Sequence, residues 1–207
     1  MDSRIKRLLD IFFVSLIILA LSPLILIICF LNKLFFPRYE IFYRQIRLGK
    51  DEKPFKLYKF RTMTNGRNKN HPEKLENYAN IFQKTKVEKS KKITWLGALL
   101  RKYYLDELPQ LFNVFQGDMS LIGPRPNLKH EIDFLRTSHP DFRNLLNIKY
   151  SARPGVTGPW QVDALKFELS DREVIQRDVE YVENSSFKSD FKLSVLTVLR
   201  IAGGTGQ

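Results

Sequence analysis

The feature that most constrains this chain is an apolar run close to its N-terminus. Residues 11–31 read IFFVSLIILALSPLILIICFL, in which only Ser15, Ser22 and Pro23 fall outside the apolar set. About 20 such residues are enough for a helix to cross the hydrocarbon core of a bilayer. The run is longer than the apolar part of a secretory signal, and the NKLFFPRYE that follows offers no small-residue cleavage site. We therefore expect a helix that inserts into a membrane.

Two features bear on whether this helix crosses the membrane. Pro23 removes a backbone donor and clashes with the preceding turn, which favours a sharp bend, and Ser22 can hydrogen-bond the freed carbonyl. Cationic flanks favour the cytoplasm. Basic residues stand on both sides of the run, namely Arg4, Lys6, Arg7, Lys33, Arg38, Arg44 and Arg47. The residues alone leave two interpretations open, a re-entrant helix with both ends in the cytoplasm and a spanning helix with a tolerated kink.

The charge of the chain is positive and unevenly spread. The formal net charge is +12; residues 1–105 hold 22 Lys and Arg against 8 Asp and Glu, whereas residues 106–207 hold 12 against 14. This balance predicts a polyanionic partner: a nucleic acid, an anionic membrane surface or a phosphorylated substrate. The lysines of residues 65–92 lack a stacking platform, so we expect no nucleic acid. The single cysteine, Cys29, allows no internal disulfide.

Residues Ile41 to Met63 predict a β-hairpin, because two aromatic and β-branched runs flank the turn-rich LGKDEKP. In the second run Lys59 and Arg61 fall on the same face as Phe55 and Leu57. Two cations on one face form a workable phosphate clamp. An edge strand with ordinary solvated charges is the alternative.

The rest of the chain has a mainly helical pattern. Residues 65–92 predict a loop with a short helix near Glu73 to Gln83. The helix that starts at Ile93 suits either a membrane interface or a buried core face. Further helices are expected around Glu131–Leu135, Asp171–Glu183 and Asp190–Ile201.

The stretch LDELPQLFNVFQGDMSLIGPRP places two carboxylates before a short apolar helix. Proline is tolerated in a first helical turn, so Asp106 is expected as the N-cap, Glu107 as the first helical residue and Pro109 as the third, with Gly117 ending the helix. A helix N-terminus favours an ionised carboxylate, which can act as a nucleophile, and a second carboxylate can hold Mg²⁺. The alternative is that both residues only stabilise the helix end.

Two arginines sit on rigid turns downstream of these carboxylates. Arg125 belongs to GPRP and Arg153 to ARPGVTG, and prolines and glycines flank both. Arginine grips phosphate oxygens with two parallel hydrogen bonds, so either residue suits a phosphate site. Solvated loop arginines are the alternative.

Four motifs in order, behind an apolar segment that contains Ser-Pro, carry a family resemblance: KFRTM, LDELPQLFNVFQGDMSLIGPRP, RPGVTGPWQVD and DVEYVENSSFKSDFKL. The chain resembles the bacterial sugar transferases, which are monotopic phosphoglycosyl transferases that begin the assembly of O-antigen, capsule, exopolysaccharide or glycoprotein glycans. Where relatives often read TGWAQV, this chain reads TGPWQV, which moves the aromatic residue to Trp160.

The resemblance implies an activity and a set of roles. The family moves a sugar-1-phosphate from a UDP-sugar to undecaprenyl phosphate, releases UMP and needs Mg²⁺. By position in its motifs, Asp106 matches the nucleophile that forms a covalent phosphosugar intermediate, and Glu107 matches a metal ligand. Lys59 and Arg125 match active-site cations, and Arg153 matches a phosphate contact. The alternatives are a polyprenol-phosphate glycosyl transferase that releases UDP and a non-catalytic membrane scaffold.

The expected fold class is α+β and mostly helical. Residues 1–36 would form a re-entrant membrane helix broken at Ser22 and Pro23. Residues 37–207 would form a catalytic domain with a small β-hairpin and interfacial amphipathic helices, on the cytoplasmic face of the bacterial inner membrane. The expected partners are the UDP-sugar, undecaprenyl phosphate and anionic lipids, and a homodimer stays open.

Overall fold

The computed structural model describes residues 3–64, 93–163 and 169–204. The elements, in chain order, are α1 (Ser3–Phe35), β1 (Phe42–Leu48), β2 (Pro54–Phe60), α2 (Trp95–Lys102), α3 (Gln110–Gln116), β3 (Ser120–Ile122), α4 (Lys129–Ser138), α5 (Phe142–Tyr150), β4 (Gly155–Thr157), α6 (Pro159–Val162), α7 (Asp171–Glu183) and α8 (Phe187–Ala202). Short 3-10 turns also occur at Lys50–Glu52 and Leu105–Glu107.

The mostly helical α+β class and the hairpin are confirmed. β1 and β2 pair antiparallel, with Phe42 opposite Phe60, and these two rings stack. The helix predicted over Asp171–Glu183 has these bounds, and the last helix begins at Phe187 rather than at Asp190. The sequence did not predict α5 or the parallel pairing of β3 with β4. The short helix expected near residues 73–83 lies outside the described residues.

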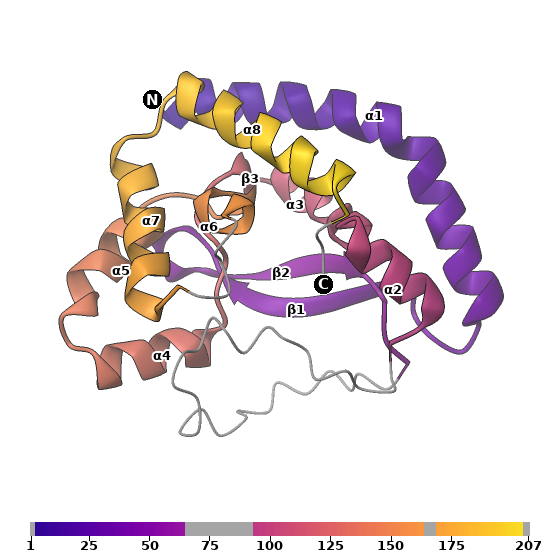
Figure 1. Ribbon diagram of the computed structural model, residues 1–207, viewed down its shortest axis with the longest axis horizontal. Helices are drawn as coiled ribbons and strands as arrows, with labels where there is room; N and C mark the ends of the chain where they lie inside the picture. Colours follow the sequence, from indigo (N-terminus) through magenta and orange to yellow (C-terminus); the bar gives the residue numbers. More distant parts are fainter. Residues whose placement is uncertain (1–2, 65–92, 164–168, 205–207) are drawn as a thin grey trace.

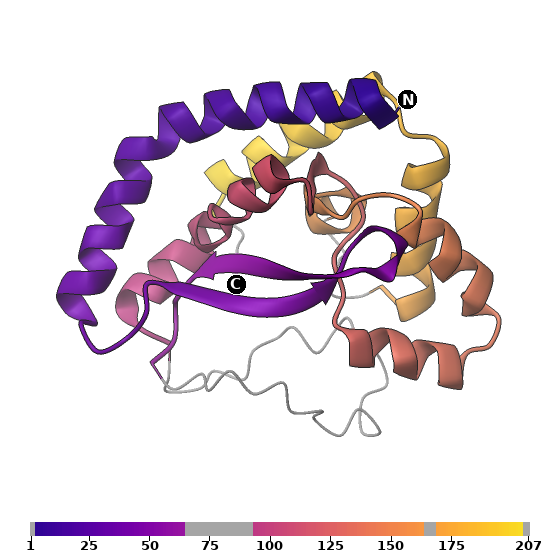
Figure 2. The ribbon, with the colours of Figure 1, turned by 180° about the vertical axis from the view of Figure 1, so that it is seen from behind.

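Helix α1 is continuous over 33 residues and bends partway along its length (Figures 1 and 2). Pro23 has no N–H to donate to the Leu19 carbonyl, and the Ser22 hydroxyl donates to this carbonyl instead, at 2.8 Å. The backbone therefore stays helical through Ser22 and Pro23, and the re-entrant placement of this helix in a membrane stays a prediction. By length and composition alone α1 could cross a membrane.

Helix α1 has buried residues both before and after Pro23. Asp10 and Val14 are buried before Pro23, and Ile28 and Asn32 are buried after it. The opposite side exposes large apolar side chains to the outside: Ile5, Leu8, Phe12, Phe13, Leu16, Leu19, Leu26, Ile27, Phe30, Leu34 and Phe35. A helix with one side fixed to protein and the other side apolar is suited to lie between the rest of the chain and lipid.

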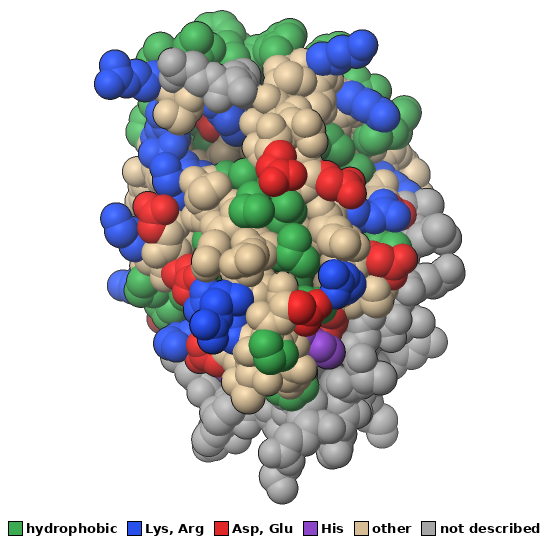
Figure 3. All heavy atoms as spheres, turned by 90° about the vertical axis from the view of Figure 1, so that its left-hand side faces the viewer, with side chains coloured by type: hydrophobic (Ala, Val, Ile, Leu, Met, Phe, Trp, Pro, Cys, Tyr) green, Lys and Arg blue, Asp and Glu red, His purple; other side chains and the backbone are tan. Residues whose placement is uncertain are grey.

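Three apolar clusters make up the core of the described residues. The first half of α1 packs with β2, α3 and β3, and its second half packs with β2 and α2. The third cluster joins α4, α5, α6 and α7 at the end of the molecule away from the bend of α1 (Figure 1). Figure 3 looks onto this end and shows Lys, Arg, Asp and Glu side chains mixed over it, with apolar side chains gathered at the top, where α1 and α8 lie.

Candidate active site

The two carboxylates lie in a 3-10 turn between α2 and α3. Tyr104, just before this turn, has a left-handed backbone with φ of 55°, which is costly for a residue with a side chain and is common at functional sites. α3 begins at Gln110 with Pro109 as its N-cap, so the prediction that Asp106 caps this helix is wrong. The prediction that Gly117 ends α3 is confirmed by its φ of 98°.

The turn brings the carboxylates to strand β2. Lys59 Nζ lies 2.5 Å from Glu107 Oε1, and both side chains are partly exposed. The Asp106 side chain is buried next to this pair. The structure therefore joins Lys59, Asp106 and Glu107, three residues that the sequence predicted for one site.

The surroundings of Asp106 act on its pKa in opposite directions. Burial raises the pKa and the Glu107 carboxylate adds to the rise, whereas Lys59 and Arg101 lower it; the net direction is upward. The expectation that a helix N-terminus favours the ionised form is contradicted, because Asp106 is not at one. The two cations oppose the effect of burial and limit the rise in the pKa of Asp106.

Arg125 completes the group of charges. Its guanidinium lies 4.2 Å from the centre of the Trp160 ring and interacts electrostatically with Glu107, Glu131 and Arg47. Among the described residues, its Nε is buried and has no hydrogen-bond partner. An arginine that is stacked on an aromatic ring but lacks a hydrogen-bonded acceptor is suited to bind an anionic ligand.

Backbone contact between two loops fixes the position of Arg125. The Gly123 N–H donates to Thr157 O, and the Gly155 N–H donates to Pro124 O, both at 2.9 Å. A Cβ on Gly158 would lie 2.0 Å from Gly123 O. Glycine is required at these places because the two backbones touch. The GPRP and GVTGPW segments therefore form one rigid unit under Arg125 and Trp160.

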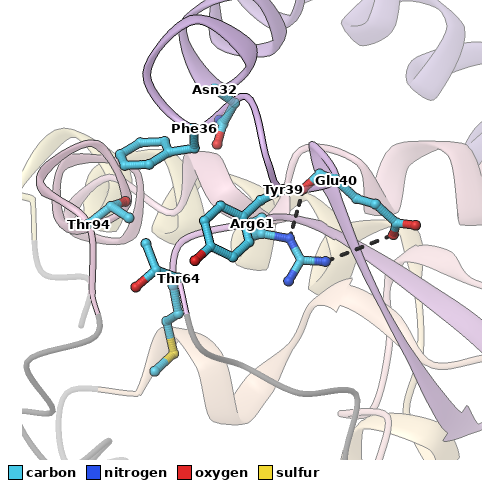
Figure 4. Close-up of a pocket in the computed structure, with 8 residues that line it drawn as sticks. Asn32, Phe36, Tyr39, Glu40, Arg61, Thr64 and Thr94 are labelled. Atoms are coloured by element: carbon cyan, nitrogen blue, oxygen red, sulfur yellow. Dashed lines mark hydrogen bonds and ion pairs between the residues drawn. The ribbon is translucent and has the colours of Figure 1, made fainter.

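Arg61 and Arg153 occupy other places. Figure 4 shows Arg61 in a pocket beside Tyr39 and Glu40, where its Nε donates to Glu40 O at 2.7 Å. Arg153 Nε donates to Gly117 O at 2.9 Å, at the C-terminal end of α3. Neither guanidinium has a described hydrogen bond or ion pair to the carboxylates, so their phosphate-binding roles stay predictions.

Sequence reasoning did not identify Arg101, Arg47 and Trp160. Arg101 Nε donates to the Thr62 hydroxyl at 2.9 Å and its charge acts on Asp106. Arg101 could have been identified from the sequence, because it lies in the last turn of the predicted helix, just before Asp106 and Glu107. Arg47 and Trp160 could not be found this way, because their relation to Arg125 depends on tertiary contact.

The carboxylates provide the donor set that Mg²⁺ prefers. The described residues contain no group of three or more His, Cys, Asp or Glu able to hold a metal ion. Mg²⁺ is commonly held by one or two carboxylates together with substrate phosphates and water, so Asp106 and Glu107 fit such an ion only in the presence of a phosphorylated ligand. Glu107 is partly exposed and could supply one carboxylate oxygen to such an ion. Lys59, which pairs with Glu107 and is also partly exposed, could contact the phosphate oxygens of the same ligand.

The fold therefore combines an apolar-faced N-terminal helix with paired carboxylates between cations, an arrangement suited to phosphorylated ligands. The family model described as bacterial sugar transferase matches residues 1–204. The chain belongs to this family and is a transferase consistent with a phosphoglycosyl transferase.

Several relatives have informative names. A Klebsiella pneumoniae protein named UDP-glucose:undecaprenyl-phosphate glucose-1-phosphate transferase is 34% identical over 94% of this chain, which spans 39% of that protein. The exopolysaccharide production protein ExoY of Sinorhizobium fredii is 34% identical over 98% of this chain and 87% of its own length. A Caulobacter vibrioides protein with the same name as the Klebsiella one is 35% identical over 93% of this chain and 68% of its own length.

Proposed function

We propose that this enzyme transfers a sugar-1-phosphate from a UDP-sugar to undecaprenyl phosphate and releases UMP. The observation that carries the proposal is the convergence of Asp106 and Glu107 with Lys59 and Arg125 in one small region. The names of the relatives supply the substrate classes, a UDP-sugar and undecaprenyl phosphate. The product feeds the assembly of a bacterial surface glycan, in line with the exopolysaccharide relatives.

The reaction would proceed in two displacements at one phosphorus atom. An oxygen of Asp106 attacks the phosphate that bears the sugar, an O–P bond forms, and the anhydride bond breaks so that UMP leaves with the electron pair. An oxygen of undecaprenyl phosphate then attacks the same phosphorus, and the aspartyl O–P bond breaks. Asp106 returns to its carboxylate form, and undecaprenyl-diphosphate-sugar leaves. Neither attacking group needs a general base once it is ionised.

The cations of the site would supply most of the catalysis. Lys59 and Arg101 would favour the ionised form of Asp106 against its burial, and the guanidinium of Arg125, which interacts with Glu107, would donate hydrogen bonds to the diphosphate oxygens. Bound Mg²⁺, with Glu107 as a ligand, would neutralise the charge of the diphosphate and of the departing UMP. Arg125 is held in place before substrate arrives, so little reorganisation is needed at the moment of reaction.

The contacts at both ends of α1 favour the re-entrant interpretation over a spanning helix. Near the N-terminus, Arg7 donates to Val114 O at 2.5 Å, and Asp10 accepts from the Ser120 hydroxyl at 2.8 Å. Beyond Pro23, Ile28 packs in a cluster with Phe60 of β2. A spanning helix would place one of these sets across the bilayer from the rest of the chain and leave Asp10 without its partners.

Exposed apolar side chains beyond α1 suggest how the enzyme sits on the membrane. They occur on α2, α3 and α8 and are Trp95, Leu99, Phe112, Phe115, Phe187, Phe191, Val195, Val198, Leu199 and Ile201. Amphipathic helices of this kind lie in the headgroup region, where basic residues also attract anionic lipids. The cytoplasmic face of the inner membrane fits this arrangement, because UDP-sugars are cytoplasmic and the acceptor is a membrane lipid.

The nucleotide released distinguishes this proposal from its nearest rival. Purified enzyme is incubated with undecaprenyl phosphate, Mg²⁺ and each of a panel of UDP-sugars, and the nucleotide product is identified by chromatography. We expect UMP with at least one UDP-sugar. Release of UDP would instead identify a glycosyl transferase that moves the sugar without its phosphate, and release of neither nucleotide would favour a non-catalytic scaffold.

A further inference from the structure

Arg125 is held from two directions by buried groups that the proposed reaction does not use. Its guanidinium lies against the ring of Trp160, which is 3% exposed. Its backbone N–H donates to Asp178 Oδ2 at 3.2 Å, and Asp178 is fully buried on α7. One group therefore acts on the side chain and the other on the backbone of the same residue.

Asp178 belongs to a buried ionic network behind the GPRP turn. Lys149 Nζ lies 2.9 Å from Asp178 Oδ2 and donates to Asn127 Oδ1 at 2.6 Å. The Asn127 carbonyl accepts from the Leu48 N–H at 2.9 Å, which ties the turn to β1. Lys149 thus connects Asp178, which accepts from the Arg125 backbone N–H, with Asn127, two residues after Arg125.

The buried ion pair between Lys149 and Asp178 is not explained by its contribution to the free energy of folding alone. A fully buried ion pair costs desolvation energy that apolar residues of similar size avoid, and such replacements are often neutral or stabilising. A second oxygen, Asp178 Oδ1, is buried without a hydrogen-bond partner among the described residues. A buried charge of this kind is better explained by the geometry it imposes on the turn than by the free energy of folding.

Trp160 acts on the side chain in a complementary way. The Nε of Arg125 has no hydrogen-bond partner in the described part of the chain, so stacking on the indole is the contact that sets the plane of the guanidinium. Pro159 begins α6, and a proline in the first turn fixes the backbone just before Trp160. The PW order in TGPWQV therefore places a rigid aromatic face under Arg125.

We infer that Trp160 and Asp178 are positioning residues for the transfer reaction, with Trp160 setting the plane of the Arg125 guanidinium and Asp178, neutralised by Lys149, setting the backbone of its turn. This inference rests on the proposed function, because Arg125 is the group that would touch the diphosphate. Neither Trp160 nor Asp178 needs to touch substrate.

A double-mutant cycle tests the role of Trp160. Trp160→Leu, Arg125→Ala and the double variant are assayed for UMP release, with kcat and KM for the UDP-sugar measured separately. We expect Trp160→Leu to lower kcat/KM about 10- to 30-fold, as for loss of a desolvated cation–π contact, and Trp160→Phe to recover most of the loss. In the Arg125→Ala background Trp160→Leu should add less than a twofold loss.

A matched pair of variants tests the role of Asp178. Lys149→Met/Asp178→Asn and Lys149→Met/Asp178→Leu both remove the buried charges, but only the first keeps an acceptor for the Arg125 N–H. We expect both to fold, as judged by thermal unfolding, and the Asn variant to have at least about a tenfold higher kcat than the Leu variant. Equal kcat values in two folded variants would overturn the role of Asp178.

The outcomes separate this inference from the proposed function. If the wild-type enzyme releases UMP but Trp160→Leu causes the same loss with and without Arg125, the positioning role of Trp160 is overturned and the proposed function stands. If the wild-type enzyme neither releases UMP nor binds inorganic pyrophosphate by calorimetry, the proposed function fails and the inference fails with it. A loss that depends on Arg125 supports both.

Discussion

At the scale of single residues, the site balances two carboxylates against nearby cations. Lys59 has two tasks, because it pairs with Glu107 and also favours the ionised form of Asp106. Its side chain is partly exposed, so substrate oxygens can reach it. Removing this charge should therefore affect catalysis far more than folding.

The variant Lys59→Met tests this balance. We expect kcat/KM for the UDP-sugar to fall about 100-fold, the usual loss for one preorganised donor at a developing charge, with little change in the melting temperature. Lys56→Met is the matched control, because Lys56 lies on the same strand and is exposed; its activity should stay within about twofold. Similar losses in the two variants would contradict the role of Lys59.

The buried carboxylate of Glu131, which interacts with Arg125, should make the free energy of unfolding depend on pH. Burial raises its pKa, but Arg47, Arg125 and the Leu128 N–H outweigh burial and hold the pKa below its usual value. A lowered folded-state pKa stabilises the fold above the ordinary carboxyl pKa, and this contribution is lost as pH falls through the folded-state value. Glu131→Gln should therefore lower the free energy of unfolding by about 2 kcal/mol at pH 7.

Denaturant unfolding of both proteins, from pH 7 down to pH values below the ordinary Glu pKa, measures this effect. The difference between wild type and Glu131→Gln should be constant near neutral pH and shrink below the ordinary Glu pKa, because the unfolded chain binds a proton there while the folded carboxylate is still ionised. A difference that is independent of pH would show that the carboxylate charge does not contribute.

Arg125 and Arg153 show what a sequence can and cannot predict about a site. Both have proline and glycine neighbours, so the local sequence pattern predicts a phosphate-binding role equally for the two. In the fold, Arg153 donates to the carbonyl of Gly117, just after α3, whereas Arg125 stacks on Trp160 near Glu107. Lys59, Asp106 and Glu107 could be predicted together because the motifs carry them, but tertiary contact decides which arginine joins them.

At the scale of elements, close contact between the β3 and β4 segments builds the floor of the site. α7 was predictable because Ser170 and Glu173 form a capping box. The three-residue strands were not, because long-range pairing rather than local propensity defines them. The start of α3 was misjudged because a 3-10 turn holds the residues before Pro109.

Gly158→Ala tests the contact between these segments. Its methyl group would lie 2.0 Å from Gly123 O, so the two backbones would have to separate, and we expect a loss of about 3 kcal/mol in the free energy of unfolding. Gly49→Ala is the control, because its methyl would meet the Phe55 ring at 3.1 Å and Lys53 O at 3.3 Å, contacts that shifts of a few tenths of an ångström relieve. If unfolding showed the same small loss in both, the loops would not be packed as described.

At the scale of the whole molecule, α1 is part of the core, and we propose that its exposed apolar side anchors the enzyme in the membrane. Lys6 of α1 pairs with Asp190 of α8 at 2.6 Å, close to the contacts of Arg7 and Asp10. These polar contacts hold the start of α1 on the side of the catalytic residues. We therefore propose that both ends of α1 face the cytoplasm.

Cysteine labelling tests this topology. In a Cys29→Ser background, Ser3→Cys should resist an impermeant thiol reagent applied to intact spheroplasts and react with it in inverted membrane vesicles. The vesicles are the control for reactivity of the thiol. Labelling from the periplasmic side would show that α1 spans the membrane.

The central claim is that Asp106 attacks the sugar-bearing phosphate, and single-turnover analysis without acceptor tests it most directly. Enzyme is mixed with the UDP-sugar and Mg²⁺ but no undecaprenyl phosphate, and UMP release and the mass of the peptide containing Asp106 are measured. We predict one UMP per active site and a phosphosugar mass increase on that peptide, both absent in Asp106→Asn. UMP release that always requires acceptor, with no adduct on any peptide, would contradict the account.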